Sequence, residues 1–398
     1  MWLRIYLYEL FQSLIVDNFL WFIYLLHLGY SATLIGLGYA AYSATMLAFN
    51  VPSSWIADRF SKRAVLFTAS IAKTLGSICF LFGGLGFGLI VAGFVMAGIA
   101  TALPSGVDLA YVQNIVNDGP ENCGSSGVLR AKLSRFVSMQ GVASLAAGVL
   151  GGALAAWSWH VLYLADTIVG IITMVLVWSL PAPRKSQDSC IQRQAGGFLW
   201  KPYCEAARLL IRGPVAFRAV AGVIAVVWAL AAVQTTYTQG LLRVEGLSVT
   251  VIPLVFAATA VLAVAGSWCT GRLKTRSSKQ AGAIALTWLY AVSGALRAVS
   301  LPSPAGAVIS TAGGIAGGQL ASGLSGVLFN EELLRHTPQG SESVALSAVN
   351  TMQMLLMMAG FPLFGLLAAR IGFHAIFAVC GIALAAVAVI LTVKSLFA

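Results

Sequence analysis

The sequence predicts an all-α integral membrane protein with twelve transmembrane helices in two pseudo-symmetric six-helix bundles. Composition, the length of the apolar runs and an internal repeat lead to this fold class. Of 398 residues, 59% are hydrophobic and only 9% are charged, whereas about 25% of a typical soluble protein is charged. This composition disfavours soluble enzymes, nucleic-acid modules, secreted disulfide scaffolds and disordered chains. The apolar runs are too long for the alternating strands of a membrane barrel, so helices are expected.

The twelve helices are expected where apolar runs reach the length of about 20 residues that a bilayer requires. Breaks between the runs coincide with turn residues, such as Gly29-Tyr30-Ser31 and Pro302-Ser303-Pro304. The expected spans are 5–28, 33–56, 64–84, 88–113, 133–157, 160–181, 215–242, 247–270, 280–300, 303–330, 343–369 and 371–394. The first run is too long for a signal peptide and lacks a cleavage site after it, so we expect it to remain as a helix.

The basic residues predict the orientation of these spans, because cytoplasmic loops of membrane proteins are enriched in Lys and Arg. Twenty of the 24 Lys and Arg residues fall on one side of the expected spans. Arg243, Arg297 and Arg370 fall on the other side, and Lys73 lies within the third span. We therefore expect both termini to be cytoplasmic. The net charge of +11 then reflects membrane orientation and not a nucleic-acid partner.

The one long polar stretch divides the chain into three parts. We expect an N-terminal six-helix bundle (1–181), a cytoplasmic linker (182–214) and a C-terminal six-helix bundle (215–398). The basic, partly amphipathic residues 198–212 fit either a helix lying on the inner leaflet or a solvated linker.

An internal repeat supports this division, because three segments recur in the same order in both halves. Gly29-Tyr-Ser-Ala-Thr-Leu-Ile recurs as Gly246-Leu-Ser-Val-Thr-Val-Ile. Ser54-Trp-Ile-Ala-Asp-Arg and Gly152-Ala-Leu-Ala-Ala recur as Ser267-Trp-Cys-Thr-Gly-Arg and Gly365-Leu-Leu-Ala-Ala. The offsets stay between 213 and 217 residues. A duplicated bundle of six plus six helices is the architecture of one large class of transporters.

Over essentially the whole chain these features resemble the major facilitator superfamily. Its signature after the second span, G-x-L-A-D-R-x-G-R-[KR]-x-x-[LV], is matched here by Asp58-Arg59 and the basic pair Lys62-Arg63, while serines replace both glycines. The resemblance implies that Asp58, Arg59, Lys62 and Arg63 form a gating network that latches the two halves in one state. Acids below the fourth span, such as Asp118, are the expected partners of the basic residues. Plain positive-inside anchoring is the alternative role.

Acids inside the expected spans are the candidates for transport, because ionisable groups are costly in a bilayer. Glu9, Ser13 and Asp17 recur at every fourth position of the first span, and Tyr24 lies nearby on the same face. The resemblance implies that this span lines a central cavity. A carboxyl there can take up a proton on one side and release it on the other. Asp17 is therefore predicted to be the proton or cationic-substrate site, the alternative being a permanently paired carboxylate.

Two further acids and Lys73 also lie within the expected spans. Asp108, close to Tyr111 in the fourth span, has three open roles: coupling site, substrate contact or partner of the gating arginines. Lys73 either pairs with an acid or extends toward the interface. Asp166 is expected to be structural.

Neutral polar residues are the expected contribution of the second half to a substrate cavity. Gln234 and Tyr237 belong to a polar run at the end of the seventh span, which a lipid-facing helix would not tolerate. Gln319 in the tenth span follows two glycine pairs, at which the backbone can approach a ligand. Together with Ser13, Tyr24 and Tyr111, these residues complete the predicted substrate cavity.

The sequence therefore predicts a secondary transporter of a small organic solute that works by alternating access. Proton-coupled export by antiport is the first choice, and proton-coupled uptake or the movement of lipid-like solutes is the alternative. Two departures from the drug-exporting branch of the family, Gly148 in place of a proline and no arginine in residues 101–114, weaken drug/proton antiport.

A membrane enzyme or a non-transporting sensor is a remote alternative, because the sequence carries no hydrolase, metalloprotease or phosphate-binding motif and no sizeable soluble domain. We expect no cofactor and no metal. The expected partners are the solute, protons and the bilayer. The resemblance implies a monomer in the cytoplasmic (inner) membrane.

Overall fold

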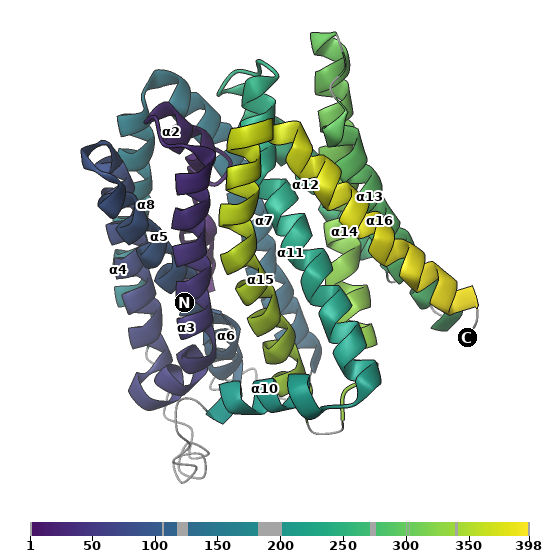
Figure 1. Cartoon of the computed structure of the whole chain (residues 1–398). Helices are drawn as coiled ribbons and strands as arrows, with labels where there is room; N and C mark the ends of the chain where they lie inside the picture. The colour runs from purple at the N-terminus through teal and green to yellow at the C-terminus, as the bar shows by residue number, and fades with distance from the viewer. Residues whose placement is uncertain are drawn as a thin grey trace. The chain divides into compact units, whose positions relative to one another are not determined.

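The computed structural model describes residues 2–105, 107–117, 126–181, 201–270, 276–299, 301, 303–338 and 341–396, and every regular element in these ranges is a helix. Contacts between the helices divide the chain into two compact units. The first unit comprises Met1–Asn18 and Ala41–Pro202, and the second comprises Phe19–Ala40 and Tyr203–Ala398. The long helix α3 (Ala32–Phe60) contributes to both units. The helices are labelled in Figure 1.

The first unit is organised around α4 (Lys62–Leu81), which packs against α5 (Phe87–Ala102), α6 (Val107–Asn117) and α8 (Trp159–Trp178). The short α1 (Trp2–Ser13) packs against α8 and α7 (Ser126–Trp157). A 3₁₀ turn, η1 (Gly83–Leu85), joins α4 to α5. Ser61 and Ser158 begin α4 and α8 as N-caps, accepting hydrogen bonds from the backbone N–H groups of Ala64 and His160.

The second unit is centred on α11 (Val215–Val244), which contacts the short α2 (Trp21–His27), α15 (Glu342–Ile371) and α16 (Phe373–Leu396). Two further helices, α13 (Arg276–Ala298) and α14 (Pro304–Arg335), pack side by side, and α14 also covers α12 (Val251–Thr270). Gly266 and Gly323 let α12 and α14 approach closely, since a Cβ at either position would meet the backbone of the other helix.

The helix α10 (Lys201–Arg212) lies beside the start of α15 (Figure 1). Its Leu209 and Leu210 pack against the apolar core of the second unit, while Arg208 and Arg212 are exposed. The C-terminal part of the linker predicted from the sequence is thus a helix packed onto this unit. Contact with a lipid leaflet stays a prediction.

The composition of the surface agrees with a membrane environment. Large apolar side chains are exposed on many helices; Trp157, Ile309, Ile382 and Val175 are 80%, 72%, 72% and 64% exposed. In the described part of the chain, ten helices are long and apolar enough to cross a membrane. Of the twelve predicted spans, the two outside this set are the interrupted first span and α14, whose glycines and polar residues lower its hydropathy. The exposed apolar side chains are those that lipid would cover.

The prediction of one continuous helix over residues 5–28 is wrong, because residues 14–20 between α1 and α2 are not helical. Asp17 and Asn18 lie in this unwound segment, and both residue types are poor helix formers. The predicted span at 88–113 is also interrupted, between α5 and α6, where the carbonyl oxygen of Pro104 accepts hydrogen bonds from the N–H groups of Val107 and Asp108. Non-helical backbone at this depth requires polar partners within the protein.

The internal repeat is visible as two turns of the same geometry. Gly29 after α2 and Gly246 after α11 have φ angles of 87° and 88°, a conformation that favours glycine. In both turns the glycine N–H bonds to the carbonyl three residues back, and the next N–H bonds to the carbonyl five residues back. Ser31 and Ser248 then accept a hydrogen bond from the N–H three residues ahead. The recurring Gly-x-Ser segments therefore form the same turn twice.

Candidate transport cavities

A cavity of about 350 Å³ within the first unit is lined by four carboxyl groups and one ammonium group. Glu9 comes from α1, Asp17 from the unwound segment, Lys73 from α4, Asp108 from the first turn of α6 and Asp166 from α8. We call it the acidic cavity. Four carboxyl groups beside one ammonium leave an excess of negative charge, which a proton or a cationic group would compensate.

Lys73 holds the end of α1 in place. Its Nζ donates hydrogen bonds to the carbonyl oxygens of Phe11, Gln12 and Leu14, at 2.7, 2.9 and 2.9 Å. These are carbonyls at the C-terminal end of a helix, which carries a partial negative charge and lacks intrahelical donors. The ammonium group therefore satisfies backbone oxygens that the break in the first span leaves free.

Asp166 holds the other side of the break. Its Oδ1 accepts a hydrogen bond of 3.0 Å from the backbone N–H of Val16, and its Oδ2 accepts one from the hydroxyl of Ser77 on α4. Lys73 and Asp166 are 8% and 5% exposed. The unwound segment is therefore fixed by a cation on its carbonyl side and an anion on its amide side.

Asp17 lies close to both of these groups. It is 7% exposed, and its electrostatic neighbours are Asp166, the Tyr163 hydroxyl and Lys73. No Lys, Arg or His in the described residues forms an ion pair with it, because the ammonium of Lys73 is engaged by the carbonyls of α1. Asp17 is thus buried, faces the cavity and is not neutralised by a permanent partner.

Glu9 is held by two neutral donors. Its Oε1 accepts hydrogen bonds from Ser13 Oγ at 3.0 Å and from Gln140 Nε2 at 2.8 Å, while the buried Oε2 has no hydrogen-bond partner. Asp108 is half-buried, and its Oδ1 accepts a hydrogen bond from the N–H of Leu109. Glu9, Ser13, Asp17 and Asp108, all singled out from the sequence, are therefore gathered in one cavity.

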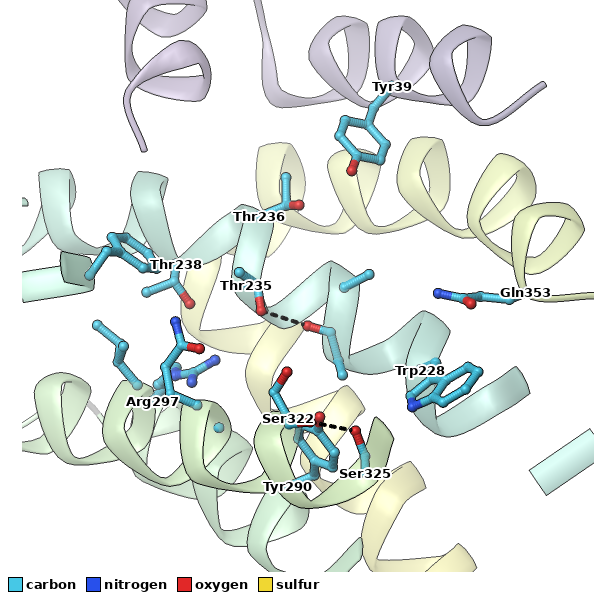
Figure 2. A pocket seen from close by; sticks show the side chains of 16 residues that line it. Tyr39, Trp228, Thr235, Thr236, Thr238, Tyr290, Arg297, Ser322, Ser325 and Gln353 are labelled. Atoms are coloured by element: carbon cyan, nitrogen blue, oxygen red, sulfur yellow. Dashed lines mark hydrogen bonds between the residues drawn. The ribbon is translucent and has the colours of Figure 1, made fainter. Parts of the chain in front are cut away.

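A second cavity, of about 360 Å³, lies within the second unit. Its walls combine aromatic rings with small hydroxyl-bearing and amide side chains, and Arg297 is its one charged residue; we call it the arginine cavity. Figure 2 shows Arg297 and Trp228 at opposite ends, with Thr235 and Ser322 between them. The lining residues are Tyr39, Trp228, Ala231, Ala232, Thr235, Thr236, Thr238, Phe256, Tyr290, Arg297, Ile315, Gly318, Gln319, Ser322, Ser325 and Gln353.

Arg297 is only 3% exposed. Its guanidinium donates to the carbonyl of Gly314 at 2.6 Å and to Oε1 of Gln234 at 3.4 Å, and it lies 5.7 Å from the centre of the Phe377 ring. Its buried Nε–H has no hydrogen-bond partner. Arg297, which falls on the outer side of the expected spans, lies in the last turn of α13, and its side chain is buried against α14.

Of the remaining predicted substrate residues, only Gln319, which is half-buried, lines the arginine cavity. The hydroxyl of Tyr237 donates to the carbonyl of Phe361, and that of Tyr111 donates to the carbonyl of Pro181, both at 2.6 Å. Tyr24 is only 4% exposed. Oε1 of Gln234 accepts a hydrogen bond from the Arg297 guanidinium. These four lie outside the lining of both cavities.

The predicted gating residues are described only in part. The side chains of Asp58 and Arg59, at the end of α3, and the whole of Asp118 lie outside the described residues. Nζ of Lys62 donates to the carbonyl of Ala110 on α6 at 3.3 Å. Arg63 donates to the carbonyl of Trp178 and lies over its ring. The basic pair thus binds a carbonyl within α6 and the C-terminal end of α8.

Sequence reasoning missed the role of Arg297 and did not identify the backbone groups that Lys73 and Asp166 bind. For Lys73 and Asp166 the signal was a charged residue within an apolar run; Asp166 was expected to be structural, and Lys73 was expected to pair with an acid or to extend toward the interface. For Arg297 the signal lies in α14, where Gly314 and Gly318 face the arginine. A Cβ on Gly314 would lie 2.7 Å from Cγ of Arg297, and one on Gly318 would lie 2.8 Å from its Nη2. Glycine at these two positions makes room for the side chain.

Helical spans, a repeated bundle and buried charges in cavities define a membrane transporter. The sequence matches the Major Facilitator Superfamily over residues 10–360, and the chain belongs to this family. The family consists of transporters, so the prediction that the chain is not an enzyme is confirmed. A comparison with curated protein sequences gave no match.

Solved structures show the same fold at low sequence identity. The crystal structure of a mutant of the nucleoside transporter NupG is 12% identical, with a TM-score of 0.81 over 98% of this chain and 99% of that one. A POT family transporter in complex with 5-aminolevulinic acid is 14% identical, with a TM-score of 0.71 over 98% and 94%. A D-xylose-proton symporter is 14% identical, with a TM-score of 0.69 over 97% and 96%.

Proposed function

We propose that this chain is a proton-coupled secondary transporter that moves a small organic solute across the cytoplasmic (inner) membrane by alternating access. The observation that carries the proposal is the acidic cavity, in which Asp17 is buried and has no ion-pair partner among the described residues. Such a carboxyl exchanges a proton at low electrostatic cost, whereas one locked to a cation would not. The protein is proposed to act as a monomer with both termini in the cytoplasm.

Coupling requires that protonation changes the relative stability of two conformations. The unwound segment is suited to this role, because Asp17 shares it with the backbone groups that Lys73 and Asp166 bind. Protonation of Asp17 removes its negative charge and thereby changes the electrostatic potential at Lys73 and at Asp166. Asp108 and Glu9 are proposed as secondary proton sites in the same cavity. Asp58, Arg59, Lys62, Arg63 and Asp118 are proposed as the gating network.

Export by antiport is the direction that the sequence favours, and uptake by symport is the second candidate. The second is supported by the likeness of the fold to the D-xylose-proton symporter. The direction of transport determines whether the solute is depleted or enriched in cells that produce the protein.

The test compares the metabolite content of cells producing the wild-type protein, Asp17→Asn or Glu332→Gln. Glu332 is a partly exposed acid on α14 paired with Arg335, and serves as the matched control. We expect wild type and Glu332→Gln to change the level of the same solute, and a protonophore to abolish that change. Asp17→Asn, present in the membrane at equal amounts, should leave the solute at background. Wild-type behaviour of Asp17→Asn removes this residue from the mechanism, and a change that persists with the protonophore refutes proton coupling.

A further inference from the structure

The arginine cavity contains a buried charge without a counter-ion. Arg297 is its only charged lining residue, and in the described residues no carboxylate lies within ion-pair distance of the guanidinium. A buried guanidinium without an anion is costly. Neutral oxygens of Gly314 and Gln234 compensate only part of this cost, and the Nε–H remains without a partner.

We infer that Arg297 is the anchor for an organic carboxylate, so that the transported solute is a small organic anion; this rests on the proposed transport function. A guanidinium offers donors in a fixed planar fork that matches a carboxylate. The unpartnered Nε–H supplies one donor of such a fork. The carboxylate would both neutralise the buried charge and satisfy this donor.

The other residues that line the cavity indicate the chemistry of the anion beyond its carboxylate group. Tyr39, Trp228, Phe256 and Tyr290 supply aromatic walls, which suit an apolar or aromatic group. Several lining hydroxyls already donate to their own helix, as Thr235 does to the carbonyl of Ala231 and Ser325 to that of Ser322 (Figure 2). A volume of about 360 Å³ is at the small end of ligand sites. A monocarboxylate with one ring or a short chain fits this description.

Substitution of a glycine on α14 can displace the guanidinium of Arg297 while its charge is kept. In Gly318→Ala the new methyl group would meet Nη2 of Arg297 at 2.8 Å, and this flexible end can shift aside. In Gly313→Ala, on the same helix, the methyl group would lie 3.8 Å from Leu296 Cδ1, an ordinary contact. Gly318→Ala thus displaces the anchor, and Gly313→Ala is its matched control.

The experiment measures thermal unfolding of the purified full-length protein with benzoate, phenylacetate or hexanoate as probes, and with benzamide and benzylamine as uncharged and cationic counterparts. We expect at least one carboxylate to raise the melting temperature of the wild type and of Gly313→Ala, and benzamide to have no effect. Arg297→Gln should weaken carboxylate binding about tenfold or more, as expected for a charged hydrogen bond. Gly318→Ala should weaken it measurably.

If Arg297→Gln does not fold, Gly318→Ala and the comparison with benzamide decide the question. The inference is overturned if none of the three carboxylates stabilises the wild type, if benzamide or benzylamine does so equally well, or if the carboxylate effect survives both substitutions. Binding at fixed pH in detergent does not require proton coupling. A protein that binds carboxylates but moves no solute therefore refutes the proposed transport and leaves the carboxylate site at Arg297 standing. A protein that moves a solute but binds no carboxylate overturns this inference and leaves the proposed transport standing.

Discussion

At the scale of single residues, three buried charges behave differently because their partners differ. Lys73 is satisfied by three backbone carbonyls, and Asp166 by an amide and a hydroxyl. Arg297 retains an unpartnered Nε–H. Buried charges with complete hydrogen bonding contribute to structure, whereas those with unmet capacity are available for ligands. By this criterion Lys73 and Asp166 position the unwound segment, and Arg297 retains a donor for a ligand. Asp17 is proposed for proton exchange on a different ground, because it is buried and has no ion-pair partner among the described residues.

Lys73→Met tests the positioning role. The substitution leaves three carbonyl oxygens at the end of α1 without their donor, which costs about 1–3 kcal/mol for each buried group left unsatisfied. We expect a clear fall in the melting temperature of the purified protein. Lys132→Met is the control, because Lys132 lies 4.4 Å over the Trp2 ring and such a contact contributes only about 0.5–1 kcal/mol when exposed. Equal melting temperatures for the two variants would show that Lys73 does not stabilise the break.

At the scale of elements, the repeated turns after α2 and α11 show how duplicated sequence gives duplicated structure. Gly29 and Gly246 occupy the same left-handed conformation, and the same pair of backbone hydrogen bonds closes each turn. A side chain at either glycine meets no other atom within 4 Å. The requirement for glycine therefore comes from the backbone and not from packing.

Gly29→Ala and Gly246→Ala should each lower the free energy of unfolding by about 1–2 kcal/mol, the cost of a left-handed conformation for a residue with a Cβ. Gly141→Ala is the control, since Gly141 lies within α7 and its Cβ would also point into open space. In a helix this change is neutral or stabilising, by up to about 1 kcal/mol. Melting temperatures of the three variants check this order. A loss in Gly141→Ala as large as in the turn variants would contradict it.

Most elements were predictable from the sequence, because apolar length and turn residues act locally. The predicted spans at 64–84 and 215–242 differ from α4 and α11 by only a few residues. The break at residues 14–20 was not predictable, since its backbone partners, Lys73 and Asp166, are remote in sequence. Acids within apolar runs revealed Glu9, Asp17 and Asp108. In the polar run that suggested Tyr237, Thr235, Thr236 and Thr238 line the arginine cavity, whereas Tyr237 itself is used for packing against α15.

At the scale of the whole molecule, the acidic cavity of the first unit and the arginine cavity of the second are both lined by buried charged groups of the described residues, and the two cavities differ in the sign of that charge. The acidic cavity carries an excess of carboxyl groups, and the arginine cavity carries a single guanidinium. A duplicated fold has thus diverged in chemistry between its halves. This divergence supports one unit handling protons and the other binding an anionic solute.

Orientation is testable through Cys204, which is exposed on α10. In a variant whose other five cysteines are serine, a membrane-impermeant maleimide should label Cys204 in inverted vesicles but not in intact cells, because α10 is predicted to be cytoplasmic. Ser248→Cys in a cysteine-free background is the control, since its turn after α11 is predicted to face outward. It should be labelled in intact cells. Reversed labelling of the two variants would invert the predicted topology.

The cluster of carbonyls at the end of α1 has a consequence for the ionic conditions under which the protein operates. In other transporters, oxygens of an unwound helix coordinate a sodium ion that enters and leaves with each cycle. Here the corresponding charge is the Lys73 side chain, which is covalently tethered and cannot dissociate. The shape of this segment should therefore be indifferent to replacement of sodium by choline.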